Sequence, residues 1–147
     1  MNQQSEIVNI RYAALVVGVV MLFLGLAGFL ASATSEYAAA YPQPGYSYAL
    51  GLFPTNYFHN AIGILTGLWG IAAFTSLGGS ISFHRAFAIV YGIQAVLGLL
   101  PFTNTFFGTM PLYGNNVWFS ILLAGVTYYY GFMKSGSITQ KLVSPQT

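Results

Sequence analysis

Residues 13–30 read AALVVGVVMLFLGLAGFL, an unbroken apolar run without a charged side chain. A helix needs about 20 such residues to cross the hydrocarbon core of a bilayer. The uncharged stretch after Arg11 fits one crossing, and those after Glu36 and Arg85 each fit up to two crossings with a loop. The sequence therefore predicts an integral membrane protein. The charged residues that separate these stretches are four basic and two acidic: Glu6, Arg11, Glu36, Arg85, Lys134 and Lys141.

Composition supports a membrane protein and excludes several other classes. Hydrophobic residues make up 56 % of the chain and charged residues 4 %, whereas a typical soluble domain has about 25 % charged residues. A net charge of +2 without a basic run argues against binding to nucleic acid. The absence of cysteine excludes disulfides, thiolate metal sites and iron–sulfur clusters. We expect one domain over residues 1–147.

The first apolar run has a second interpretation as a cleaved signal peptide. Ala31-Ser32-Ala33, which follows the run, resembles a signal-peptidase site. However, the run exceeds the roughly 7–15 apolar residues of a signal core. We interpret it as a retained membrane span.

Hydropathy and helix-breaking residues predict four transmembrane helices, at about 13–33, 58–77, 82–100 and 117–133. The second helix is expected to end at Gly78-Gly79 and the third at Pro101, because these residues disfavour a continuing helix. The polar tail after Lys134 is predicted to be mobile.

The segment between the first two helices is predicted to lie at the membrane surface. Its prolines and glycine, at Pro42, Pro44, Gly45 and Pro54, exclude a long helix. Its tyrosines suit a membrane interface, where the ring lies among headgroups and the hydroxyl reaches water. These tyrosines are Tyr37, Tyr41, Tyr46, Tyr48 and Tyr57.

The positions of the basic residues predict an orientation. Arg11 precedes the first helix, Arg85 lies between the second and third, and Lys134 and Lys141 follow the fourth. With four crossings, all of them fall on one side of the membrane. By the positive-inside rule, both termini are expected to be cytoplasmic or stromal.

An internal repeat is visible in the sequence. At an offset of 57 residues, Pro54 matches Pro111 and His59 matches Asn116. Leu24-Gly25-Leu26 matches Leu97-Gly98-Leu99 at an offset of 73. Two helix pairs in the same orientation imply a pseudo-twofold axis along the membrane normal.

Two predicted helices each carry a face of small and polar residues at helical spacing. Such faces let helices approach closely in lipid, and we expect the second and fourth helices to pack together through them. The alternative is a narrow polar path or ligand site between them. The residues of the two faces are Gly63, Thr66, Gly67 and Gly70, and Asn116, Ser120, Ala124 and Thr127.

Both histidines are candidate ligands of a tetrapyrrole. His59 is expected at the outer end of the second helix, close to Asn116, and His84 at the cytoplasmic end of the third, beside Arg85. An imidazole at either place has the chemistry to ligate a metal. The alternative for both is an ordinary interfacial histidine, because no carboxylate or cysteine stands nearby to complete a metal site. We expect no protein-bound metal.

Catalytic constellations are missing from the sequence. There is no aspartate, and both glutamates lie outside the predicted spans, so no carboxylate pair is available for acid–base chemistry. No Ser-His-Asp set, phosphate-binding glycine loop or HExxH motif is present. We therefore expect that the protein is not an enzyme.

Several motifs together resemble a known family. Phe53-Pro54-x-Asn56-x-x-His59-Asn60 resembles the second-helix motif of domain of unknown function 4383, and Gly108-x-x-Pro111-Leu112 with Gly114-Asn115-Asn116-x-Trp118 resembles its fourth-helix motif. The first and third helices fit as well, through Gly18, Gly28-Phe29, Arg85, Gly92 and Leu97-Gly98. The resemblance implies a four-helix bacterial membrane protein, which we expect in an inner membrane of plasma or thylakoid type. It brings no established activity.

The chain departs from the family pattern at three positions. The family typically has a histidine where Gly63 stands, an acidic residue where Asn116 stands and a histidine where Ser120 stands. Any ionic or cofactor-binding use of these positions is therefore in question here, which favours a structural role.

We expect a non-enzymatic accessory or scaffolding subunit of a larger membrane complex, such as a photosynthetic or respiratory assembly. Its partners would be the lipid bilayer and other integral membrane subunits, with pigment or lipid filling gaps between them. The alternative is a passive channel or small-solute facilitator that uses the polar face of the second and fourth helices. A membrane enzyme is the third and least favoured reading.

Overall fold

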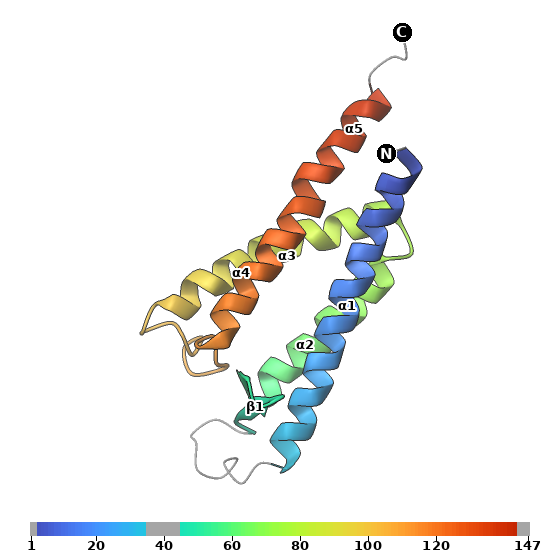
Figure 1. Ribbon diagram of the computed structural model, residues 1–147. Coiled ribbons are helices and arrows are strands. Elements are labelled where there is room, and N and C mark those ends of the chain that lie inside the picture. The colour runs from blue at the N-terminus through green and yellow to red at the C-terminus, as the bar shows by residue number, and fades with distance from the viewer. Residues whose placement is uncertain (1–2, 35–44, 144–147) are drawn as a thin grey trace.

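The computed structural model describes residues 3–34 and 45–143, and it is mostly helical. The predicted interfacial Tyr37 and Tyr41 lie outside these residues. Figure 1 shows that the described chain begins and ends at the same end of the molecule, away from a small β-hairpin. The elements in order are α1 (Gln3–Thr34), β1 (Ser47–Ala49), β2 (Phe53–Thr55), α2 (Tyr57–Ala73), α3 (Leu77–Leu99), α4 (Asn115–Tyr128), the π-helical segment η2 (Tyr129–Lys134) and α5 (Ser135–Val143).

Two of the helices, α1 and α3, are long and apolar enough to cross a membrane. α1 has 32 residues and contains an 18-residue window with a mean hydropathy of 2.6, and α3 has 23 residues and contains such a window with a mean hydropathy of 1.3. Their outward-facing side chains are large and apolar, as lipid contact requires. The side chains that are more than half exposed include Val16, Phe23 and Leu30 on α1, and Ile89, Ile93 and Val96 on α3.

The boundary between α2 and α3 differs from the prediction. α2 begins where Asn56 caps it, with Asn56 Oδ1 accepting from the His59 amide at 2.9 Å, and it ends at Ala73. Gly78 and Gly79 do not end this helix, because they lie in the first turn of α3. Ser76 caps that turn, and its hydroxyl accepts from the Gly79 amide at 3.0 Å. A side-chain cap thus outweighs the low helix propensity of two glycines.

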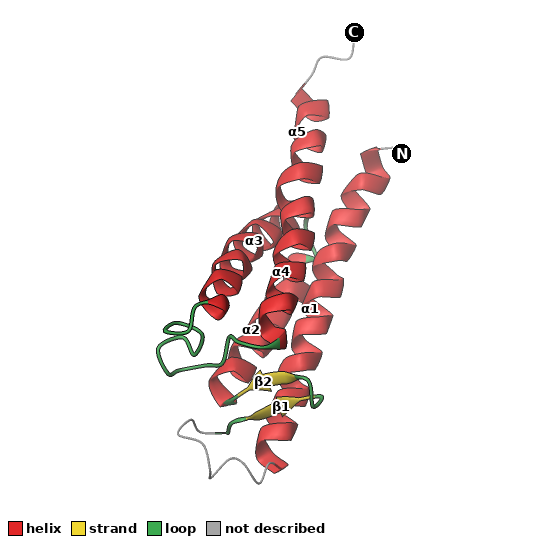
Figure 2. Ribbon diagram, turned by 60° about the vertical axis from the view of Figure 1, so that its left-hand side comes forward, coloured by secondary structure: helices red, strands yellow, loops and turns green. Residues whose placement is uncertain are grey.

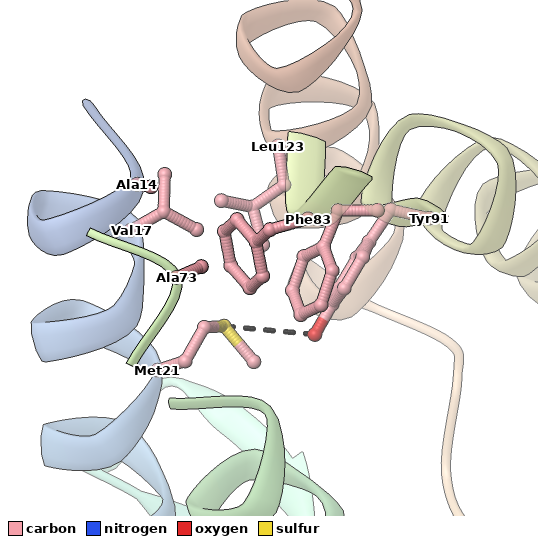
Figure 3. Close-up of a cluster of buried hydrophobic side chains, with 8 residues drawn as sticks. Ala14, Val17, Met21, Ala73, Phe83, Tyr91 and Leu123 are labelled. Carbon is pink, nitrogen blue, oxygen red and sulfur yellow. Dashed lines mark hydrogen bonds between the residues drawn. The ribbon is translucent and has the colours of Figure 1, made fainter. Parts of the chain in front are cut away.

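The apolar core lies where α1 and α2 meet α3 and α4 (Figure 3). Three aromatic rings of α3 form a column through it. The ring centroids of Phe83 and Phe87 are 4.2 Å apart, and those of Phe87 and Tyr91 are 5.1 Å apart. The Tyr91 hydroxyl donates to Met21 Sδ of α1 at 3.5 Å. The cluster consists of Ala14, Val17, Met21, Ala73, Phe83, Phe87, Tyr91 and Leu123.

The chain after Lys134 is helical to Val143, so the prediction of a mobile tail from that point is wrong. Figure 2 shows α4, η2 and α5 as one continuous rod. The carbonyl of Gly131 in η2 accepts from Arg85 Nε at 2.8 Å and from Ser135 Oγ at 2.5 Å. The π-helical turn changes the backbone hydrogen-bonding pattern around the Gly131 carbonyl, and these two side chains provide hydrogen bonds to it. Ile138, only 1 % exposed, anchors α5.

A β-hairpin precedes α2, which the sequence analysis did not predict. Its strands pair antiparallel, with Ser47 opposite Thr55. Leu50 and Gly51 have φ values of 54° and 69°, which match a tight hairpin turn with two positive φ angles. The hairpin ties α4 in place, because Asn115 Nδ2 donates to the Leu52 carbonyl at 3.0 Å.

Candidate functional site

A small polar cavity lies between the helix pairs, beside the hairpin strands. Its volume is about 40 Å³, and its walls come from α1, both strands, α2, α3 and α4. Polar side chains from four of these elements converge on it, although most of the surrounding residues are apolar. Those side chains are Thr55, His59, Asn60, Tyr91, Gln94 and Asn116. A convergence of polar groups at such a place is the strongest candidate for a functional site in the described residues.

His59 stands in the first turn of α2 and lines this cavity. Its ring is within hydrogen-bonding reach of the Pro54 backbone, whereas its buried Nδ1 has no partner among the described residues. The described residues contain no group of three or more histidine, cysteine or carboxylate side chains that would hold a metal ion. A ligand pocket usually has about 300–1,000 Å³, so a cavity of about 40 Å³ does not fit a tetrapyrrole.

Asn116 lies on the same cavity, so the structure brings it together with His59 as the sequence analysis predicted. Asn116 is buried, and its Nδ2 donates to the Pro54 carbonyl at 2.7 Å and to the Pro111 carbonyl at 2.9 Å. It therefore joins the start of α4 to the segment that leads into α2. Gln94 of α3 lines the cavity beside Asn116, and its Nε2 donates to Ser120 Oγ of α4 at 3.2 Å.

Asn60 is a site residue whose role the sequence analysis missed. It is 2 % exposed, its Nδ2 donates to Ser32 Oγ at 3.2 Å, and its Oδ1 accepts from the Thr55 hydroxyl. Gly28 makes room for this amide, because a Cβ at Gly28 would overlap Asn60 Oδ1. Ser32, interpreted above as part of a sequence resembling a peptidase site, is 1 % exposed. A lone asparagine in an apolar helix was the available signal, since such a group needs a buried partner.

The small face of α2 packs against α1, so the predicted packing of the second helix against the fourth is wrong. A Cβ at Gly67 would lie 2.7 Å from Leu22 Cα, and one at Gly70 would lie 2.6 Å from Gly18 Cα. A Cβ at Gly63 would likewise lie 3.2 Å from Gly25 Cα of α1. The sequence alone does not show whether α2 packs against α1 or α4, because α1 offers glycines at a spacing as suitable as that of the small residues on α4.

The small face of α4 belongs mainly to its packing with α3. Ser120 bonds with Gln94 of α3, and Ala124 packs against the core cluster. The Thr127 hydroxyl donates to the Leu123 carbonyl at 2.6 Å, and that of Thr66 on α2 donates to the Ile62 carbonyl at 2.8 Å. The Thr127 hydroxyl thus bonds within its own helix, whereas that of Thr66 is also within hydrogen-bonding reach of Tyr91 on α3. The two small faces do not form one polar path in this arrangement.

His84 lies far along α3 from the cavity and is fully buried within the protein. Its Nε2 lies 3.1 Å from the Ile10 carbonyl of α1. Its ring stacks on Tyr130, with centroids 5.4 Å apart, and meets the edge of Phe83 at 5.6 Å. Surrounded in this way, His84 has no open approach for the metal centre of a tetrapyrrole.

Tyrosines link the hairpin to the segment before α4. The hydroxyls of Tyr46 and Tyr113 are 2.5 Å apart, and Tyr46 also donates to the Tyr48 hydroxyl at 3.3 Å. Burial, followed by these hydrogen bonds, raises the pKa of Tyr46 above its ordinary value. Tyr46 therefore stays neutral at physiological pH and serves as a hydrogen-bonding group.

Comparison with known proteins identifies the family of the chain. No curated protein and no solved structure is similar enough to the chain to match it. One family model does match, over residues 11–133. This range runs from Arg11 in α1 to Met133 in η2, and it includes the hairpin and the whole cavity. The chain therefore belongs to the family described as Domain of unknown function (DUF4383).

Proposed function

We propose that the protein is a non-enzymatic, four-span membrane protein that serves as an accessory or scaffolding subunit of a larger complex in a bacterial inner membrane. The observation that carries this proposal is the exposed aromatic loop between α3 and α4. Phe102 is 75 % exposed and Phe107 is 74 % exposed, so two large rings project from the same loop. Aromatic side chains are enriched where membrane proteins meet partners.

The backbone of this loop is strained at its tip. Phe106 and Phe107 have φ values of 45° and 56°, which bulky residues rarely adopt. Turn hydrogen bonds hold the conformation, including that from the Gly108 amide to the Thr105 carbonyl at 3.0 Å. Strain of this kind costs about 1–3 kcal/mol per residue and concentrates at functional sites. A loop shaped to present aromatic rings supports a docking role.

The surfaces of α2 and of the rod formed by α4, η2 and α5 support two further membrane spans. Leu65 and Leu68 on α2, and Trp118 and Leu122 on α4, are each more than half exposed. The rod runs from residue 115 to residue 143, long enough at about 1.5 Å per residue to cross the roughly 30 Å core. α2 has 17 residues, so it spans about 25 Å and is the shortest of the four.

The basic side chains support cytoplasmic termini. Arg11 Nε donates to the Phe74 carbonyl in the α2–α3 turn at 2.8 Å, and Arg85 Nε donates to Gly131 in η2. Lys134 lies over the Tyr130 ring at 5.8 Å. Three of the four basic residues thus lie on or against the α2–α3 turn and η2. Both termini of the described chain lie at one end of the molecule (Figure 1), and basic residues that flank the spans on one side are typical of a cytoplasmic end.

The pairing of the helices supports the proposed repeat. α1 packs mainly with α2, and α3 with α4. Gly25 and Gly98, equivalent at the offset of 73 residues, are both close-contact positions. A Cβ at Gly25 would lie 2.7 Å from the Ile64 amide nitrogen, and one at Gly98 would lie 2.5 Å from the Leu112 carbonyl oxygen.

Purification from native membranes in mild detergent, followed by native mass spectrometry, tests the proposed role. We expect integral membrane subunits to co-purify in fixed stoichiometry. Phe107→Asn removes a ring while keeping a residue that tolerates positive φ, and it should reduce this co-purification. Leu52→Asn, at a residue that is 56 % exposed in the hairpin turn, is the matched control. A chain that purifies alone, or whose partners are indifferent to Phe107→Asn, contradicts the proposal.

The polar cavity favours a second candidate function, a passive channel or small-solute facilitator. Below the cavity the aromatic column of Phe83, Phe87 and Tyr91 fills the space between the helix pairs, so conduction would require these pairs to separate. Swelling of proteoliposomes in small neutral solutes tests this function. Swelling that increases with the protein and decreases on His59→Phe would favour the channel over the accessory subunit.

A further inference from the structure

We propose that the polar cavity is a binding site for two or three water molecules, which bridge the α1–α2 pair to the α3–α4 pair. The site is a separate inference from the docking role above, since it rests on the cavity and not on the aromatic loop. Its ligand class is water, bound to neutral donors and acceptors.

The volume of the cavity sets the size of its occupant. A water molecule requires about 10–15 Å³ when volume is measured as space open to a water-sized sphere. The cavity has about 40 Å³ by this measure. It therefore has room for about three waters.

The polar groups of the cavity provide the partners that bound water needs. Internal waters usually make two to four hydrogen bonds to otherwise unsatisfied groups. His59 Nδ1 is buried and lacks a partner among the described residues. The amides of Asn60, Gln94 and Asn116 and the hydroxyl of Tyr91 line the same space. Each already has a protein partner, so each can offer water only its remaining hydrogen-bonding capacity. Because a buried polar atom without a hydrogen bond costs free energy, a water bound to His59 Nδ1 would stabilise the folded protein.

The arrangement of the helices gives these waters a structural role. α2 and α4 form no extended contact along their described residues. At the cavity rim, Asn116 Nδ2 donates to the Pro54 carbonyl. The other direct polar contacts between the two pairs include those of His84 with the Ile10 carbonyl and of Tyr91 with Met21 Sδ. Inward, the aromatic column closes the space. Waters between His59 of α2 and Gln94 of α3 would add hydrogen bonds between the two helix pairs inside the cavity.

Radiolytic labelling in detergent or lipid tests the site, because hydroxyl radicals formed from a bound water oxidise the side chains next to it. Met21 lines the cavity and is 6 % exposed, whereas Met110 lines a separate, apolar groove and is 7 % exposed. The two have the same intrinsic reactivity and the same burial. We expect Met21 to be oxidised to the sulfoxide several-fold faster than Met110. Oxidation of Met21 no faster than that of Met110 overturns the proposal.

A pair of variants tests whether the label at Met21 comes from water in this cavity. His59→Phe replaces the unpartnered imidazole by a larger apolar ring and should bring Met21 oxidation down to the rate of Met110. Phe58→Leu, at a neighbouring side chain that is 51 % exposed, is the control and should leave the rate unchanged. If His59→Phe fails to fold, Gln94→Leu on the opposite wall replaces it. Fast Met21 oxidation that persists in a folded cavity variant contradicts bound water as its source.

Discussion

Single glycines determine how closely α1 and α2 approach each other. Gly67 faces Leu22 so closely that any side chain would meet the backbone of α1. We expect Gly67→Leu to push the two helices apart and to lower the free energy of unfolding by about 1–3 kcal/mol, the usual cost of overpacking. Thermal or SDS-induced unfolding in detergent measures the change.

Gly125→Leu is the matched control for this prediction. Gly125 is also a helical glycine, but a Cβ there would meet nothing within 4 Å. Its replacement should leave the stability unchanged or raise it slightly, because leucine favours helix more than glycine does. Equal destabilisation by both substitutions would show that Gly67 is not a contact position.

The buried amide of Asn60 gives a second prediction for a single side chain. Asn60→Ala leaves the hydroxyls of Ser32 and Thr55 without this partner, and each unsatisfied buried group costs about 1–3 kcal/mol. We expect a loss of stability in that range by the same unfolding assay. Adding Ser32→Ala and Thr55→Val should recover part of it, because the polar groups are then removed together. No recovery would show that the loss comes from packing alone.

Among the helices, α5 shows how tertiary contacts stabilise a polar segment. Ile138 is 1 % exposed within it, and Ser135 is fully buried. We expect Ile138→Ala to cost about 2–5 kcal/mol, the typical range for such a truncation in a core. Limited proteolysis should then cleave α5 faster. Ser137→Ala, on the exposed side of the same helix, should behave like the wild type. Cleavage of the wild-type α5 at the rate of the variant would contradict a docked helix.

The orientation of the whole molecule is testable because the chain contains no cysteine. A single introduced cysteine is therefore the only thiol. Phe102→Cys is in the exposed outer loop, and Gly136→Cys is at a position where a Cβ meets nothing within 4 Å. We expect a membrane-impermeant maleimide to label Phe102→Cys in intact cells and Gly136→Cys only after permeabilisation. The opposite pattern would reverse the proposed orientation.

Local sequence patterns predicted the helices well and their ends less well. α3 was expected from residue 82 and begins at Leu77, because the Ser76 cap was not recognised. α1 begins at Gln3, about three turns before the apolar run on which its prediction rested. The β-hairpin was missed because its strands have three residues each, too few for an alternating pattern to be visible.

The candidate site was predicted only in part, through His59 and Asn116. Gln94 and Asn60 were not recognised as partners, since a polar residue in an apolar helix shows a need for hydrogen bonds but not which group meets it. His84 was assigned to the interface from its neighbour Arg85. The structure shows in addition that its ring is buried against α1 and Tyr130, which its place in the sequence does not reveal.

The sequence determined the apolar helices, the family and the gathering of basic residues near particular helix ends, because these follow from the composition of each segment. The tertiary structure alone decided which helices pair. Glycine faces on α1 and α2, and small faces on α3 and α4, permit several pairings, since close packing in lipid requires only small residues and a matching shape. The observed pairing leaves α2 apart from α4, and the polar cavity exists because of that separation.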